Sequence, residues 1–244
     1  MALSLTQRRS RTEVAEQAPV PGPGGNGHGN GQLPQLDDLD CFLVKQEVEH
    51  FEAITGIETE NSYQVLGATN SRAVFGPVLA KESSSFVSRM CCGNRRPWTI
   101  RIGPAPHVLV VQRPLKFFFH EVHAYSADGT FLGTVKRQCQ GFPFQRNFAI
   151  LDETGELVLR VTCPFLSLGW NFTLRDGADD RELGNISKKW SGIAQELFTD
   201  ADNFGVGFPA DLPSNFKALV LAAVFLIDFC FFESDGNSSS RRRR

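Results

Sequence analysis

The segment from Ala218 to Phe232 constrains the fold most, because its fifteen residues include a single charged side chain, Asp228. Drawn as a helix, it presents apolar side chains around the whole circumference: Leu219, Val220, Leu221, Val224, Phe225, Leu226, Ile227 and Phe229. A helix that is apolar on all sides must be enclosed either by protein or by lipid. Pro213 and Ser214 give a start signal, so the sequence predicts a helix over residues 214–233.

The length of this segment favours enclosure by protein over a membrane span. Fifteen helical residues reach about 22 Å, whereas the hydrocarbon core of a bilayer is about 30 Å thick and needs about 20 residues. Asp228 inside a bilayer would cost about 2.5–3.5 kcal/mol. The basic tail Arg241 to Arg244 suits the cytoplasmic flank of a span, so that alternative stays open. Buried in protein, Asp228 needs a partner, which we expect on a surrounding strand.

The middle of the chain carries the signals of an antiparallel β-sheet. From Trp98 to Ile102, apolar and polar residues alternate, which is the period of a half-buried strand. Asp128-Gly129, Thr154-Gly155 and Asp176-Gly177 are turn signals with room for two strands between each pair. The strands expected between and beside these turns are Phe131–Val135, Phe148–Leu151, Leu157–Val161 and Trp170–Leu174. A sheet of this size usually closes on itself, so the sequence predicts an all-β shell around the apolar helix.

The two ends of the chain have a different composition. Residues 1–33 are rich in Pro and Gly and predict a disordered arm, and residues 237–244 form a Ser/Arg tail, which leaves 34–236 as one domain. Residues 22–27 match G-x-G-x-x-G, but no strand precedes them, so they do not predict a dinucleotide site. The formal net charge is −2 even with the four terminal arginines included, which argues against nucleic acid as a partner.

The six cysteines are scattered and show no metal-binding spacing. No apolar segment follows the arginines near the start, so the sequence predicts no signal peptide and reduced thiols in a cytosolic or nuclear setting. In such a setting the sequons at Asn171, Asn185 and Asn237 are chance matches.

Several motifs together resemble the phospholipid scramblase family. They are Gln46 to Glu58, Cys91-Cys92-Gly93, Arg113-Pro114-Leu115, Gly184 to Ile193, Phe198 to Gly205 and Phe225 to Phe229, in the family's order over residues 34–233. The resemblance implies a tubby-like fold, a closed antiparallel twelve-strand barrel around a C-terminal hydrophobic helix. It also implies calcium-dependent, ATP-independent movement of phospholipids between membrane leaflets. It further implies residence at the cytoplasmic face of the plasma membrane, with the cytoplasm and nucleus as additional locations.

The resemblance implies a calcium-binding segment from Asp200 to Asp211, with Asp200, Asp202, Asn203 and Asp211 as candidate ligands. Read as a twelve-residue EF-hand loop, the segment has Phe204 at position 5, where an oxygen ligand belongs, and Asp at position 12 in place of Glu. Phe204, Val206 and Phe208 alternate with glycines, as in a barrel strand with its aromatic face inward. A hairpin corner with exposed aspartates is the alternative to a calcium site.

Two further segments have a role only by resemblance. Lys188, Lys189 and Trp190 lie in the segment that the resemblance gives as the family's nuclear-import segment, and a strand end with two solvated lysines is the alternative. Acylated relatives carry a cysteine run after the Arg-Pro-Leu block, and this chain has Phe117 to Phe119 near that place. These phenylalanines are either strand core or a wedge for the lipid surface. Cys91 and Cys92 are the substitute acylation candidates, with bystander thiols as the alternative.

The sequence offers no catalytic constellation. G-x-S-x-G, HExxH and Walker motifs are all absent, so an enzyme is not expected. Two hypotheses remain: a calcium-dependent phospholipid scramblase, and a non-catalytic phospholipid-binding or adaptor module that acts at membranes and in the nucleus.

Overall fold

The computed structural model describes residues 33–47, 62–69, 72–84, 96–104, 107–116, 120–138, 146–163, 171–188 and 203–232. The elements are the 3₁₀ helix η1 (Pro34–Leu36), the strands β1 (Cys41–Glu47), β2 (Ser62–Thr69), β3 (Arg72–Ser83), β4 (Trp98–Ile102), β5 (Leu109–Arg113), β6 (Glu121–Ser126), β7 (Phe131–Gln138), β8 (Asn147–Asp152), β9 (Leu157–Thr162), β10 (Asn171–Asp176), β11 (Glu182–Ser187) and β12 (Asn203–Gly207), and the helix α3 (Ser214–Phe231).

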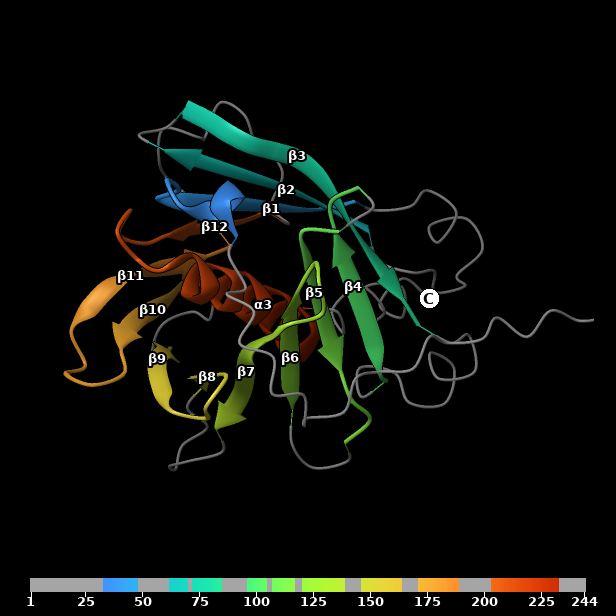
Figure 1. The fold of residues 1–244 in the computed structure, drawn as a ribbon. Coiled ribbons are helices and arrows are strands. Elements are labelled where there is room, and N and C mark those ends of the chain that lie inside the picture. The colour runs from blue at the N-terminus through green and yellow to red at the C-terminus, as the bar shows by residue number, and fades with distance from the viewer. Residues whose placement is uncertain are drawn as a thin grey trace, which may run out of the picture.

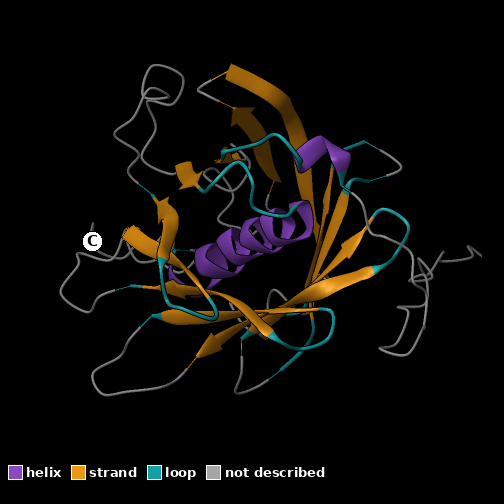
Figure 2. Ribbon diagram, turned by 60° about the vertical axis from the view of Figure 1, so that its left-hand side comes forward, coloured by secondary structure: helices purple, strands orange, loops and turns teal. Residues whose placement is uncertain are grey.

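The twelve strands form one closed antiparallel barrel. Each strand pairs with its neighbours in sequence, and β1 closes the sheet by pairing with β12, for example Val44 with Phe204. Figure 1 shows the strands arranged around α3, and the turned view in Figure 2 shows the helix running through the space that they surround. Closure leaves no unpaired sheet edge, and it confirms the predicted fold class of a twelve-strand barrel with a C-terminal helix.

The interior follows the period-2 pattern of the strands. In β4, Trp98, Ile100 and Ile102 are buried against α3, whereas Arg101 faces outward and is exposed. The same alternation of inward and outward side chains holds in β12 and the residue after it. Phe204, Val206 and Phe208 are all buried, as the sequence predicted.

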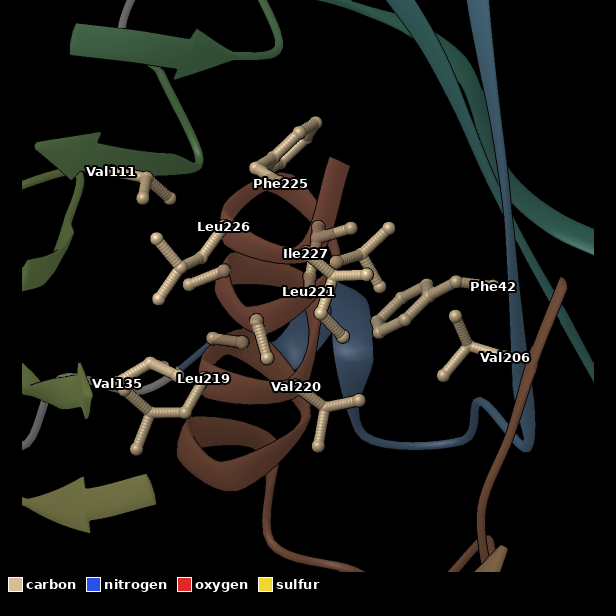
Figure 3. Packing of buried hydrophobic residues seen from close by; sticks show 14 of the residues in the cluster. Phe42, Val111, Val135, Val206, Leu219, Val220, Leu221, Phe225, Leu226 and Ile227 are labelled. Carbon is tan, nitrogen blue, oxygen red and sulfur yellow. The ribbon is translucent and has the colours of Figure 1, made fainter. Parts of the chain in front are cut away.

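Helix α3 contributes buried side chains on every side. All residues from Lys217 to Phe229 are buried. Figure 3 shows its leucine, isoleucine and valine side chains facing Val111 and Val135 on one side of the barrel and Phe42 and Val206 on the other. A core that surrounds the helix explains why the sequence lacks a polar helix face.

The helix is slightly longer than the apolar segment that predicted it. It begins at Ser214, as expected, and its eighteen residues reach about 27 Å. By length and composition alone it could cross a membrane. The barrel encloses it, however, and its residues from Lys217 to Phe229 are buried. Residues 1–32 of the predicted arm and the Ser/Arg tail lie outside the described residues. Leu33, predicted as the last residue of the arm, is instead buried in the core.

The predicted turns lie where the sequence placed them. Gly129 and Gly155 adopt φ values of +85° and +89°, which favour glycine. Their amide groups donate to the carbonyls of Ser126 and Asp152, which closes each hairpin. In the third turn the positive φ (+60°) belongs to Asp180 rather than to Gly177.

Candidate functional site

The two ends of the barrel differ in how the strands are joined. At the end where α3 begins, which we call the entry end, the joining segments have two to six residues: 70–71, 103–108, 127–130, 153–156, 177–181 and 208–213. At the opposite end, the exit end, they have seven to fifteen residues: 48–61, 84–97, 114–120, 139–146, 163–170 and 188–202. By their sequence positions, most of the predicted site residues fall between the strands that these longer segments join: Cys91, Cys92, Lys188, Lys189, Trp190, Asp200 and Asp202. Of these, the structure describes Lys188.

Asp228 lies on the last turns of α3, inside the barrel near the exit end. Its side chain is buried, and its Oδ2 accepts a hydrogen bond of 3.0 Å from the hydroxyl group of Tyr63 on β2. The Tyr63 ring in turn packs edge-on against Phe225, with ring centroids 5.1 Å apart. The expected partner on a barrel strand is therefore present, and the contact ties the helix to β2 across 165 positions of sequence.

A buried ion pair lies close to Asp228, and the sequence analysis did not predict it. Arg96 donates to both carboxylate oxygens of Glu82, at 3.1 and 3.3 Å, and both side chains are buried. The Arg96 guanidinium also lies 5.2 Å from the centre of the Phe229 ring, which stacks on Trp98 at 4.5 Å. A charge-assisted, two-bond pair of this kind holds Arg96, two residues before β4, to the end of β3.

Cations surround the C-terminal end of α3. The guanidinium carbons of Arg137 and Arg146 each lie 4.9 Å from the centre of the Phe231 ring. The Lys188 Nζ lies 4.2 Å from the centre of the Phe232 ring and 5.5 Å from that of Phe204. Positive charge at this position also complements the negative end of the helix dipole.

This contact bears on the nuclear-import prediction. Lys188 is half-buried against aromatic rings, so it is not the solvated lysine of the alternative interpretation. Lys189 and Trp190 lie outside the described residues, and the import segment remains a prediction.

The structure describes two of the four predicted calcium ligands and places them apart. Asn203 opens β12 at the exit end, and Asp211 is exposed beyond the other end of the strand, at the entry end. The five residues of β12 alone span about 13 Å, so one ion cannot contact both side chains. Asn203 and Asp211 therefore do not belong to one calcium site, because the strand that the aromatic alternation predicted forms the middle of the segment. Asp200 and Asp202 lie outside the described residues.

Asn203 itself is unusual within the described part of the chain. Its side chain is only 7% exposed, and neither Oδ1 nor Nδ2 has a hydrogen-bond partner. Buried polar groups are normally satisfied. No cluster of three or more His, Cys, Asp or Glu side chains within the described ranges has the geometry to hold a metal ion.

The cysteines within the described ranges are poor candidates for acylation. Burial, reinforced by the charge of Asp40, raises the pKa of Cys41 to about 11. Cys163 is buried and Cys230 is half-buried, and none of the three forms a disulfide. Since the thiolate is the reactive form, Cys41 is a weak nucleophile. Cys91 and Cys92, the predicted acylation sites, and Phe117 to Phe119 lie outside the described residues.

Glu121 and His123 on β6 are two titratable side chains that are paired with each other. Glu121 accepts hydrogen bonds from Lys116 and from His123, the latter at 3.0 Å. Burial opposes ionisation, but these two partners hold the pKa of Glu121 below its usual value. Glu121 is thus kept as a carboxylate and does not have the raised pKa of a general acid.

The entry end contains a buried cation that sequence reasoning missed. Lys217, on the first turns of α3, donates to the carbonyl oxygens of Leu36 at 3.0 Å, of Ala210 at 2.8 Å and of Asp37. Its Nζ also lies 5.7 Å from the centre of the Phe208 ring. A single lysine at the border of the apolar segment was the available signal. The sequence did not predict the three carbonyl acceptors, because they come from two segments that are far apart in the chain.

Comparisons with known proteins point to one family. The family model described as Scramblase matches residues 25–234. Phospholipid scramblase 1 of Mus musculus is 36% identical over 222 residues, covering 86% of this chain and 66% of the mouse protein. Phospholipid scramblase 2 of Bos taurus is 35% identical, covering 82% of this chain and 71% of its own length. The human phospholipid scramblase family member 5 is 33% identical, with coverages of 82% and 77%.

The chain spans just under two thirds of the length of the mouse and rat phospholipid scramblase 1 proteins. No solved structure matches this chain.

Proposed function

This chain belongs to the scramblase family, and on that basis we propose that it moves phospholipids between the two leaflets of a membrane. The observation that carries the proposal is the family match over residues 25–234, which includes the whole barrel and α3. Relatives over most of this range bear the name phospholipid scramblase. The movement is proposed to be bidirectional, independent of ATP and dependent on calcium.

Lipid movement of this kind requires no bond to be made or broken. It requires only a lower barrier for a polar headgroup to cross the hydrocarbon layer, so we propose that the protein is not an enzyme. Glu121 supports this, since its pKa is held low by Lys116 and His123 rather than raised for proton transfer.

We propose that calcium binds at the exit end, through Asp200 and Asp202 with Asn203 beside them. Carboxylate and amide oxygens are the ligands that calcium prefers. The buried Asn203 side chain, whose Oδ1 accepts no hydrogen bond, supports an additional ligand at this place. With few carboxylates available, the affinity is expected toward the weak end, with a dissociation constant of about 10⁻⁴–10⁻³ M.

The proposed location is the cytoplasmic face of the plasma membrane. The proposed sites of lipid attachment are at the exit end of the barrel. Cys91 and Cys92 are proposed acylation sites there, and the segment around Lys188, Lys189 and Trp190 is a proposed nuclear-import signal. One acyl chain or the four terminal arginines alone would anchor the protein only reversibly.

The enclosed helix favours a second candidate function. Because α3 is surrounded by strands, it offers no hydrophilic path for a headgroup. A non-catalytic phospholipid-binding or adaptor module at membranes, and in the nucleus, is compatible with the same fold.

Reconstitution separates the two functions. The full chain in phosphatidylcholine/phosphatidylserine vesicles, with a fluorescent lipid and a membrane-impermeant quencher, is expected to accelerate leaflet exchange as calcium rises from zero to millimolar, without ATP. An unchanged exchange rate across that range, with the protein shown to be bound, would reject scrambling and leave the binding module.

A further inference from the structure

Two cations lie directly opposite each other on the outer face of the barrel. Lys81 on β3 is the cross-strand partner of Arg101 on β4, and both side chains are exposed. Their neighbours in register, Ala80 and Ile102, point inward and are buried. Like charges in this arrangement are destabilising. Among the described residues, neither the Lys81 side chain nor the Arg101 side chain has a hydrogen bond or an ion pair.

The barrel contains a second such pair, and there the protein supplies an anion. Arg160 on β9 is opposite Arg175 on β10. The carboxylate of Asp180 bridges them, with one oxygen 3.4 Å from the Arg160 Nη1 and the other 3.7 Å from the Arg175 Nη1. Asp180 adopts a positive φ of 60° in the turn that presents it.

Within the described residues, no carboxylate bridges Lys81 and Arg101. The described ranges 62–69, 72–84, 96–104 and 107–113, which form this wall, contain one acidic residue, Glu82. Glu82 points into the barrel and is bonded to Arg96. The outward charges described on this wall are therefore positive and uncompensated.

The pair borders a groove of about 720 Å³ in the outer wall. The groove is lined by both cations, by His107 and by Glu82, whose buried carboxylate is bonded to Arg96. Its apolar lining includes Val78, Leu79 and Pro104. Leu79 is 51% exposed, which makes it one of two large apolar side chains that the described residues leave exposed. Cations beside exposed apolar groups match the boundary between phosphate and acyl chain in a bilayer.

We propose that this groove binds the phosphate-bearing headgroup of an anionic phospholipid at a bilayer surface. The lipid phosphate takes the position that Asp180 takes between Arg160 and Arg175, and Leu79 contacts the acyl boundary. Contact through β3 and β4 sets the barrel on its side at the membrane. The inference deepens the proposed function by giving it a lipid contact, and it requires only that the protein acts at membranes.

The test is binding of the full chain to sedimented vesicles, which does not depend on leaflet exchange. We compare phosphatidylcholine alone with phosphatidylcholine containing phosphatidylserine. The double variant Lys81→Gln, Arg101→Gln is expected to bind the anionic vesicles about 30-fold more weakly, taking about 1 kcal/mol for each basic residue near the surface. Lys81→Arg with Arg101→Lys, which keeps both charges, is expected to retain binding.

The control is Arg160→Gln with Arg175→Gln, which removes the same charge from the pair that already has its own anion. It is expected to retain binding. An equal loss in both double variants would mean that only net charge matters, and the site would be rejected. It would also be rejected if the Lys81, Arg101 variant bound normally.

A second readout does not depend on these variants. An environment-sensitive dye on Leu79→Cys is expected to shift to the blue with anionic vesicles, whereas the same dye on Thr173→Cys of β10 is not. If inorganic phosphate produced the same response as the vesicles, a free anion rather than a lipid would be the ligand. If Leu79 and Thr173 responded alike, the groove would not be the contact. Either result would reject the groove as the lipid contact without deciding whether the protein scrambles lipids, because scrambling is measured separately by leaflet exchange.

Discussion

Helix α3 carries one buried charged side chain near each end, and the two ends of the barrel supply different hydrogen-bond partners for it. At the entry end, Lys217 donates to three backbone carbonyls, and short turns surround it. At the exit end, Asp228 is bonded to a side chain, Tyr63, and Arg137 and Arg146 lie against the Phe231 ring. The first arrangement closes the barrel with the protein's own backbone. The second lies beside the longer segments that carry most of the proposed sites.

The largest loss of stability is expected on replacing Lys217, because three backbone carbonyl groups accept hydrogen bonds from this one side chain. Burial lowers the pKa of Lys217, against the opposing charges of nearby carboxylates led by Asp37. Lys217→Met leaves the carbonyls of Leu36, Asp37 and Ala210 without this donor, at about 1–3 kcal/mol for each buried group. We expect a loss of about 3–5 kcal/mol of unfolding free energy in urea.

The exposed Lys136→Met on β7 is the control for this change and is expected to stay within about 0.5 kcal/mol of the parent protein. Equal stability of Lys217→Met and Lys136→Met would show that the entry end does not depend on the lysine contacts.

At the exit end we expect a smaller loss of stability, because the buried carboxylate of Asp228 accepts a hydrogen bond from one side chain, Tyr63. Tyr63→Phe removes the donor to a buried carboxylate and is expected to cost about 1.5–3 kcal/mol. The protein has two tyrosines, so Tyr125→Phe, on the outer face of β6, is the matched control and should cost little.

Asp228→Leu should also destabilise the protein, because it leaves the Tyr63 hydroxyl without this acceptor. The double variant is expected to lose less than the sum of the single variants. Additive losses, or a gain in stability from Asp228→Leu, would contradict the helix-to-strand contact.

Calcium sharpens the comparison, because its proposed ligands lie at one end only. At 10 mM calcium, a site with a dissociation constant of about 10⁻⁴–10⁻³ M stabilises the fold by about 1.4–2.7 kcal/mol. We expect a rise of a few degrees in Tm that Asp200→Ala with Asp202→Ala abolishes. Asp211→Ala, at the entry end, should leave the rise intact. A rise lost only with Asp211→Ala would move the ion to the other end.

The smallest effect concerns the thiol at the entry end. Since burial and Asp40 raise the pKa of Cys41 from 9.0 to about 11, its alkylation rate should keep rising with pH to about 11 in the folded protein. The folded-state pKa lies above the unfolded value, so this group's contribution to stability is complete below pH 9 and is lost as pH rises to about 11. A rate already levelling off near pH 9 under native conditions, as expected in urea, would contradict the burial of Cys41.

The sequence predicted what depends on local pattern. The apolar segment before Phe232 indicated an enclosed helix, the alternation in Trp98 to Ile102 gave an inward strand face, and the glycine turns gave the hairpins. The count of twelve strands came from the family resemblance, since periodicity alone does not fix how a sheet closes.

What the sequence did not predict depends on register between distant strands. Tyr63 and Asp228 are 165 positions apart, and Lys81 is opposite Arg101 only because β3 and β4 pair in one register. The prediction that Asn203 and Asp211 share one calcium site was wrong for a related reason. Pairing of β12 with β1 and β11 extends the middle of the segment between them and separates its two ends.

Accessibility of the two ends of α3 at a membrane tests the enclosed helix most directly. Ser214→Cys and Ser234→Cys, each in a chain whose other cysteines are replaced, are added to preformed anionic vesicles and treated with a membrane-impermeant maleimide. A helix that stays inside its barrel predicts that both positions react from the outside, before the vesicles are lysed. Reaction of one position from the outside, and of the other only after lysis, would contradict the account and make α3 a membrane span.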